Sequence, residues 1–234
     1  MKSQKETNQE WNAMAGDWDD LASSYRNSFC GWLDKENILP SSSSSSQPIT
    51  VLDFGCGTGL LTEKLRQDHP SATFLCIDAA SAMVDAVQSK IRSAEWDNVQ
   101  AICVSLADYD RGQQLANNLE QWKGTVDVVL ASSVLTFIPS SDVPGTMKVL
   151  GGLLKPGGLL CHSDWPESSS PDDSKDGDDA KEKAEEEDGI MTEAKAKKYY
   201  EHAGLECERI EPSVMFQMGP NQTATVIIGI ARKK

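Results

Sequence analysis

The sequence predicts an α/β domain on a doubly wound, mainly parallel sheet of seven strands, with helices on both faces. Three observations predict it. Short apolar runs, typical of buried strands, alternate with stretches in which apolar residues recur every three or four positions, as in helices that cover a sheet. The second observation is a glycine-rich turn after the first run. The third is a closing pair of runs, near enough in sequence to form a hairpin, which would make the last strand antiparallel.

The elements follow in this order along the chain. The expected strands cover about 51–54, 74–77, 99–104, 126–131, 159–164, 207–217 and 223–231. The expected helices cover 60–68, 81–92, a stretch marked by Leu115, Leu119 and Trp122, one ending near 154, and 192–202. Pro70 and Gly204 are typical stops beyond helix ends. These 234 residues suffice for one domain with a substantial core.

The N-terminal segment 1–40 is expected to be a helical extension that caps the domain. Large side chains recur at intervals of three and four residues, which places them on one face of one helix: Trp11, Met14, Trp18, Leu21 and Tyr25. This face either packs on the domain or covers a ligand, with Tyr25 toward the ligand. Serines at 41–46 predict a flexible linker over 41–48. The main domain then spans 49–234.

The turn after the first strand indicates the ligand. Gly55, Gly57 and Gly59 alternate with other residues, whereas a dinucleotide site has the spacing G-x-G-x-x-G. Asp53 just before the turn would repel a phosphate and attract an amine. S-adenosylmethionine fits, because it carries an amino group and a sulfonium but no phosphate. Asp78, at the end of the second strand, can accept hydrogen bonds from both ribose hydroxyls.

Residues 51–59 and Asp78 resemble the first two motifs of the class I S-adenosylmethionine-dependent methyltransferases. The phrase at 154–159, Leu-Lys-Pro-Gly-Gly-Leu, resembles another, and the resemblance runs from about Trp11 to Arg232. It implies a Rossmann-like seven-stranded sheet and S-adenosylmethionine as cofactor. With the rule that ligands bind beyond the carboxyl ends of parallel strands, it nominates a set of cofactor-binding residues: Asp53, Gly55, Cys56, Gly57, Gly59, Asp78, Ala79, Leu106, Ala131 and Ser132.

Other residues near the strand ends keep two interpretations. Met83 packs on the adenine or belongs to the core, and Asp108 accepts from the adenine amino group or is a solvated loop residue. His162 and Asp164 are the best placed candidates for a general base, although a lone histidine there is often structural. Trp165 walls the pocket or packs beneath the segment that follows. No catalytic residue and no metal site is assigned.

The predicted function is methyl transfer to a small organic acceptor. After the fourth strand the chain has Ser132-Ser133-Val134-Leu135, and not the Asn-Pro-Pro-Tyr type of phrase used on DNA bases or protein glutamine. The alternative is an inactive subunit that binds S-adenosylmethionine and acts with a partner. A nicotinamide-dependent oxidoreductase is disfavoured by the glycine spacing.

Charge and composition limit the classes of partner that the chain is expected to have. The formal net charge is −14, and no basic stripe is visible, which argues against nucleic acid. Residues 167–189 hold eleven acids and three lysines and predict a flexible, solvated insertion, through which a protein partner could dock. The six cysteines are scattered, and no apolar run is long enough to span a membrane. The polar residues 1–10 lack the apolar centre of a signal peptide. The expected location is the cytoplasm.

Overall fold

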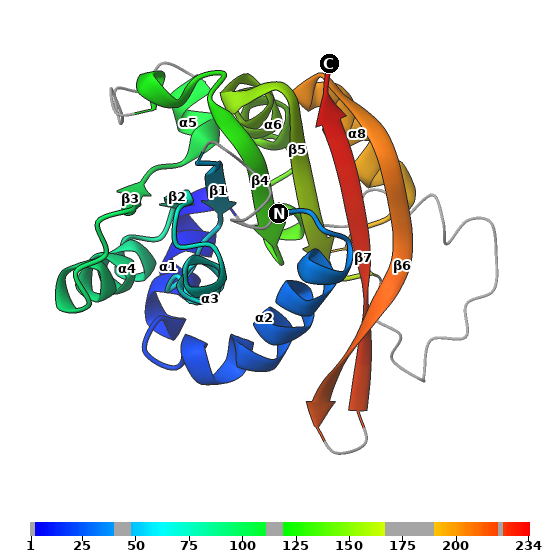
Figure 1. Cartoon of the computed structure of the whole chain (residues 1–234). Helices are drawn as coiled ribbons and strands as arrows, with labels where there is room; N and C mark the ends of the chain where they lie inside the picture. Colours follow the sequence, from blue (N-terminus) through cyan, green and yellow to red (C-terminus); the bar gives the residue numbers. More distant parts are fainter. Residues whose placement is uncertain (1–2, 40–47, 111–118, 167–189, 220–221) are drawn as a thin grey trace.

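The computed structural model describes residues 3–39, 48–110, 119–166, 190–219 and 222–234, and contains one mixed sheet (Figure 1). The strand order is β3-β2-β1-β4-β5-β7-β6. Strands β1 to β5 are parallel, and β7 is antiparallel to both of its neighbours. The strands are β1 (Thr50–Phe54), β2 (Thr73–Asp78), β3 (Val99–Cys103), β4 (Val126–Ser132), β5 (Leu154–Asp164), β6 (Leu205–Gly219) and β7 (Gln222–Lys233). The predicted fold class is confirmed.

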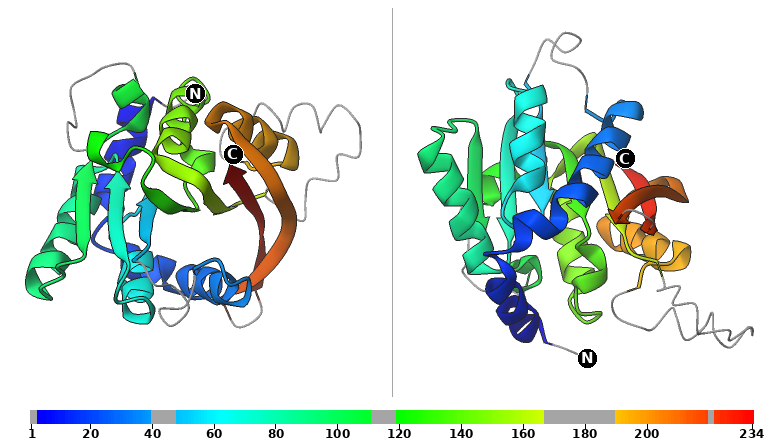
Figure 2. Two further views of the ribbon diagram at one scale, coloured as in Figure 1. Left: turned by 45° about the horizontal axis from the view of Figure 1, so that its top comes forward. Right: turned by 90° about the horizontal axis from the view of Figure 1, so that it is seen from below.

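Helices cover both faces of the sheet (Figure 2, left view). They are α1 (Gln4–Met14), α2 (Trp18–Lys35), α3 (Leu60–Asp68), α4 (Ser81–Ser93), α5 (Leu106–Asp110), α6 (Val143–Leu153) and α8 (Glu193–Ala203), with short 3-10 turns η1 (Glu120–Trp122) and η2 (Leu135–Phe137). Successive strand side chains point to opposite faces. Val51 therefore packs in the core shared with α2 and α3, and Leu52 packs in the core shared with α6 and α8.

Local sequence signals set several helix ends. Thr192 caps α8 by accepting a hydrogen bond from the Lys195 amide at 3.1 Å. Gly204 ends the same helix with a φ of +66°, in the left-handed region that favours glycine. α3 has the predicted bounds, and α4 differs from its prediction by one residue at its end. These elements were predictable because their signals lie within a few residues of one another.

The prediction of one continuous N-terminal helix is wrong. The chain turns at residues 15–17, so that Trp11 and Met14 lie on α1 whereas Trp18 and Tyr25 lie on α2. Met14 is 38% exposed, whereas Trp11 is half-buried. The side chain of Leu21 is outside the described part of the structure. The regular spacing thus continues across a turn that the periodicity did not reveal.

Two other predicted elements differ. β5 begins at Leu154 instead of 159 and passes through a register shift opposite Val126 and Val128, where the predicted glycine turn holds Gly157 at a φ of +79°. Of the helix expected around 115–122, only residues 119–122 lie in the described part, and they contain the η1 turn. The serine linker and the acidic insertion at 167–189 lie outside the described residues.

Two further features are the C-terminal hairpin and the contact between the residues that flank the acidic insertion. β6 and β7 extend past the ends of the other strands (Figure 1). The Met191 amide donates to the Trp165 carbonyl at 2.8 Å, so the residues on either side of the insertion lie next to each other.

Among the described residues, no helix is both long and apolar enough to cross a bilayer.

Candidate functional site

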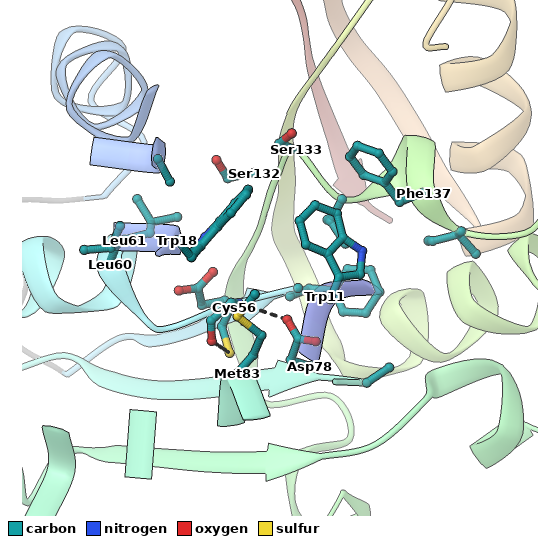
Figure 3. Close-up of a pocket in the computed structure, with 18 of the residues that line it drawn as sticks. Trp11, Trp18, Cys56, Leu60, Leu61, Asp78, Met83, Ser132, Ser133 and Phe137 are labelled. Carbon is teal, nitrogen blue, oxygen red and sulfur yellow. Dashed lines mark hydrogen bonds between the residues drawn. The ribbon is translucent and has the colours of Figure 1, made fainter. Parts of the chain in front are cut away.

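A cavity of about 540 Å³ lies beyond the carboxyl ends of β1, β2 and β4 (Figure 3). Its glycine-turn end is formed by Asp53, Gly55, Gly57 and Asp78. Its aromatic end is formed by Trp11, Tyr25, Phe137 and Trp165. The site is therefore at the place where a parallel α/β sheet binds its ligands.

The turn that closes the first end requires glycine at two positions. Gly55, Gly57 and Gly59 have φ values of +66°, +52° and +82°, all left-handed. A Cβ on Gly55 would lie 2.3 Å from Val134 Cγ2. A Cβ on Gly57 would lie 3.0 Å from the Trp18 indole nitrogen. The absence of side chains lets α2 and the segment between β4 and η2 approach the backbone of the turn closely.

Asp78 lies at the end of β2 with its carboxyl group at the cavity (Figure 3). Its Oδ2 accepts from the Gly57 amide at 2.9 Å, and its Oδ1 accepts from the Ala80 amide at 2.8 Å. Burial raises the pKa of this carboxyl group, and the backbone hydrogen bonds oppose the rise. The amides fix the group and leave lone pairs for hydroxyl donors of a ligand.

Asp53 is the second carboxyl group at the glycine-turn end and is 2% exposed. Its Oδ2 accepts from the Thr62 hydroxyl at 2.7 Å. Burial raises its pKa to about 6, against hydrogen bonds from Thr62, and nearby Asp78 raises it further. Asp53 is buried and Asp78 is half-buried, and Arg26 is the one cation among the described lining residues. Two acids at the same end of the cavity fit a ligand that brings its own positive charge. S-adenosylmethionine, implied by the resemblance, is such a ligand.

Most of the nominated residues line this cavity. Besides the four at the glycine-turn end, these are Cys56, Ala79, Leu106 and Ser132. Gly59 and Ala131 are not among the lining residues: Gly59 is the N-terminal cap of α3, and Ala131 is fully buried in the core beside Ser132. Met83 is buried and also lines the cavity, and its contact with adenine stays a prediction. Asp108 does not line it.

The N-terminal helices form a wall of the cavity. The Trp11 ring meets Trp18 edge-on at 5.1 Å and Phe137 edge-on at 5.3 Å. Asn12 Oδ1 accepts from the Ala82 amide at 2.9 Å, which ties α1 to the start of α4. No residue of α1 is buried, so this helix is held on the site by a few contacts.

Tyr25 connects α2 to β5 at the aromatic end. Its hydroxyl donates to the Ser163 carbonyl at 2.7 Å, and its ring stacks on Trp165 at 5.6 Å. The Trp165 indole in turn donates to Ser133 Oγ at 2.6 Å. Burial raises the pKa of the Tyr25 phenol well above its ordinary value, so this group stays protonated at neutral pH. Tyr25 and Trp165 both line the cavity, as one interpretation of each expected.

His162 and Asp164, the candidate general base, point away from the cavity. They share a face of β5 opposite to that of Ser163, and both are fully buried. His162 Nδ1 lies 2.9 Å from Asp164 Oδ2, and its Nε2 lies 2.7 Å from the Tyr200 hydroxyl on α8. Asp164 Oδ1 also accepts from the Thr136 amide at 3.3 Å. The pair joins β5, α8 and η2, and its geometry does not support the role of base.

Several lining residues were missed by the sequence reasoning. They are Gln4, Thr7 and Asn8 on α1, Ser24 and Arg26 on α2, and Val134, Phe137, Ile138 and Thr146 after β4. Strand ends predicted the first end of the cavity, but no local signal indicated which faces of α1 and α2 would line it. Among the described residues, no group of three or more His, Cys, Asp or Glu side chains is placed to hold a metal.

Comparisons with known proteins agree with this geometry. Residues 52–160 match the family described as a methyltransferase domain. The malonyl-[acyl-carrier protein] O-methyltransferase of Halalkalibacterium halodurans is 32% identical over 118 residues, which are 50% of this chain and 39% of that protein. The trans-aconitate 2-methyltransferase of Deinococcus radiodurans is 29% identical over 110 residues, 47% of this chain and 35% of that protein. The matches thus cover well under half the length of these relatives.

Solved structures share the whole fold. A crystal structure of an S-adenosylmethionine-dependent methyltransferase from Aquifex aeolicus superposes with a TM-score of 0.61 at 17% identity, over 95% of this chain and 98% of that one. The sequence match covers the glycine turn, β2 and the segment up to β5, and the structural match adds the antiparallel C-terminal strands. Residues 52–160 thus match a methyltransferase domain, and the fold of the described chain is that of S-adenosylmethionine-dependent methyltransferases.

Proposed function

We propose that this protein transfers the methyl group of S-adenosylmethionine to a small organic acceptor that reaches the site as a carboxylate. The observation that carries the proposal is the asymmetry of the cavity. One end presents two carboxyl groups and a glycine turn, and the other presents aromatic rings; the third carboxyl group among the described lining residues, Asp20, is at an exposed position of α2.

The glycine-turn end supports the donor. Asp78 would accept from the ribose hydroxyls, Asp53 would face the amino group, and the glycine turn would let the backbone approach the methionyl part. Ala79, Met83 and Leu106 would enclose the adenine. The bound donor supplies an electrophilic methyl group on a sulfonium, so the protein has mainly to align the acceptor and exclude water.

Beyond the two acids of the glycine-turn end, the described part of the cavity has no buried base, and this narrows the choice of acceptor. Among the described lining residues there is no histidine, lysine or glutamate, and Tyr25 is held protonated. Asp53 and Asp78 belong to the other end, and Asp20 is an exposed residue of α2. A nucleophile that arrives protonated needs a general base, whereas a carboxylate is already ionised at neutral pH. This favours a carboxylate oxygen over an alcohol or a protonated amine.

Two of the relatives support the same class of acceptor. The two enzymes are named as methyltransferases of a malonyl group and of aconitate, and both of these acceptors carry carboxyl groups. Nothing in the comparisons favours an inactive subunit. A protein partner at 167–189 and a cytoplasmic location stay predictions from the sequence.

The test is transfer of labelled methyl groups from S-adenosylmethionine to a panel of small mono-, di- and tricarboxylates, with matched alcohols, amines and the corresponding methyl esters as controls. We expect methyl ester formation on one or more acids and none on the esters. The Asp78→Ala variant at the same donor concentration is the negative control. Transfer only to amines, alcohols or tRNA would contradict the carboxylate acceptor, and no transfer to any acceptor class by protein that binds the donor would favour the inactive subunit.

A further inference from the structure

A series of buried hydrogen bonds links α8, β5 and η2 behind the aromatic end of the cavity. Tyr200, His162 and Asp164 are each at most 1% exposed. The Tyr200 hydroxyl lies 2.7 Å from His162 Nε2, and His162 Nδ1 lies 2.9 Å from Asp164 Oδ2. None of the three is among the lining residues of the described cavity, so any effect they have on a ligand there must pass through other residues.

The hydrogen bonds of this series run in one direction. Burial raises the pKa of the Tyr200 phenol, so its hydroxyl keeps its hydrogen and donates it to His162 Nε2. His162 then carries its own hydrogen on Nδ1 and donates it to Asp164 Oδ2. Gly229 of β7 lies opposite His162, and a Cβ there would collide with His162 Nε2 and the Tyr200 hydroxyl. Asp164 is therefore oriented from its β5 and α8 side.

The other oxygen of Asp164 holds η2. Asp164 Oδ1 accepts from the Thr136 amide at 3.3 Å and from the Thr136 hydroxyl at 3.4 Å. Together with His162, these donors satisfy a carboxyl group that is fully buried. The residue after Thr136 is Phe137, which lines the cavity and is 37% exposed. By fixing Thr136, Asp164 fixes the backbone from which the Phe137 ring projects.

The Phe137 ring is one of the contacts on which α1 docks. Trp11 of α1 meets it edge-on, with the ring centroids 5.3 Å apart (Figure 3). Because α1 has no buried residue, each of its contacts is a large part of what holds it. The position of η2 therefore affects how often α1 leaves the aromatic end.

We propose that Asp164 is a positioning residue for the acceptor end of the cavity. Through Thr136 it holds Phe137 where α1 docks, and His162 and Tyr200 hold Asp164 in turn. The buried residues thus act on the wall of the cavity without touching a ligand. The statement that this wall borders an acceptor rests on the proposed function, whereas the docking of α1 can be measured without any ligand.

Amide hydrogen exchange in α1, followed by mass spectrometry on the whole ligand-free chain, measures how often α1 undocks. The variants are Asp164→Asn, Thr136→Val, which removes only the hydroxyl donor, and Thr136→Ser, which restores one. The matched control is Asp127→Asn. Asp127 Oδ2 also accepts from a backbone amide, that of Thr50 at 2.8 Å, but at the amino ends of β1 and β4 and outside the described cavity lining.

Asp164→Asn should speed exchange in α1 about fivefold, the size expected for one aromatic contact. Thr136→Val should speed it about twofold, as for one weak hydrogen bond, and Thr136→Ser should stay near the wild type. Asp127→Asn should leave α1 unchanged. In a Phe137→Ala background, Asp164→Asn should add nothing in α1, because the contact through which it acts is already lost.

Three results would overturn the proposal. They are unchanged α1 exchange in both Asp164→Asn and Thr136→Val, an equal increase in Asp127→Asn, and an undiminished effect of Asp164→Asn or Thr136→Val in the Phe137→Ala background. Thermal unfolding checks folding, and if Asp164→Asn does not fold, Thr136→Val with and without Phe137→Ala decides. Titration of the wild type with S-adenosylhomocysteine is a separate measurement: a lack of binding would defeat the proposed function and leave the exchange result standing.

Discussion

The two ends of the cavity are built in different ways. The glycine-turn end comes from β1, β2 and the turn between β1 and α3, and its acids are fixed by amides and a hydroxyl within the same unit. The aromatic end is assembled from α1, α2, η2 and the end of β5, which are far apart in sequence. The comparison suggests that the first end is a rigid donor site, whereas the second depends on the docking of an N-terminal helix that has no buried residue.

The largest effect is expected at Gly55, in the turn that closes the glycine-turn end. Gly55→Ala puts a Cβ against Val134 and a non-glycine residue in the left-handed region, which together should reduce the free energy of unfolding by about 3 kcal/mol. Denaturant unfolding measures this. Gly124 has the same φ of +66° and no atom within 4 Å of its Cβ position, so Gly124→Ala reports the backbone cost alone. Equal losses in the two variants would show that contact with Val134 is unimportant.

Asp78 tests the donor site itself. Asp78→Ala should weaken binding of S-adenosylhomocysteine by about 2 kcal/mol, or roughly 30-fold, through loss of charge-assisted hydrogen bonds to the ribose. Calorimetric titration gives the affinity, and the exposed loop variant Asp97→Ala is the matched control. Unchanged affinity in Asp78→Ala would remove the ribose assignment.

Asp53 makes donor binding depend on pH. A ligand ammonium favours its ionised form, and the pKa of the folded protein's carboxyl group is about 6. Affinity for S-adenosylhomocysteine should therefore fall about tenfold from pH 7 to pH 5, since one group must ionise. Asp53→Asn should bind more weakly at pH 7 and lose this slope. A slope retained in Asp53→Asn would assign the titration to another group.

Asp53 also makes the stability of the ligand-free protein depend on pH, with the opposite sign: stability falls as pH rises, whereas donor affinity rises. Because the pKa of Asp53 is raised from its ordinary 3.8, the folded state holds its proton more tightly than the unfolded chain. Its contribution to stability is present at low pH and is lost as pH rises from about 4 to about 6, by about 3 kcal/mol. The free energy of unfolding of the wild type minus that of Asp53→Asn, measured across this pH range, isolates the contribution of Asp53. A difference that does not change with pH would contradict the raised pKa.

The smallest effect is expected at Trp11, and it distinguishes the contribution of the aromatic end from that of the glycine-turn end. Trp11→Ala removes the ring that joins α1 to Trp18 and Phe137, and should speed amide exchange in α1 severalfold, because about 1 kcal/mol of aromatic contact is lost. Donor affinity should change by less than in Asp78→Ala. Met14→Ala, at an exposed position of α1, is the control. A loss of donor binding as large as that of Asp78→Ala would show that the aromatic end also holds the donor.

The same contrast explains what the sequence could predict. Asp53, Gly57 and Asp78 were identified because a strand, a turn and a strand end lie within about thirty residues, and strand ends meet at one edge. The role of His162 was not predictable, because alternation along β5 puts His162 and Ser163 on opposite faces without saying which face borders the cavity. Likewise the turn at residues 15–17 left the periodicity of 11–25 intact, so that neither the break in the helix nor the position of Arg26 carried a local signal.

The most direct test of the central claim is calorimetric titration of the folded wild-type protein with S-adenosylmethionine and S-adenosylhomocysteine, with NAD as the control. A rigid donor site predicts binding of both sulfur compounds with dissociation constants on the order of micromolar, about −8 kcal/mol, and no binding of NAD. Binding of NAD, or of none of the three, would contradict the assignment of the glycine-turn end as a methyl-donor site.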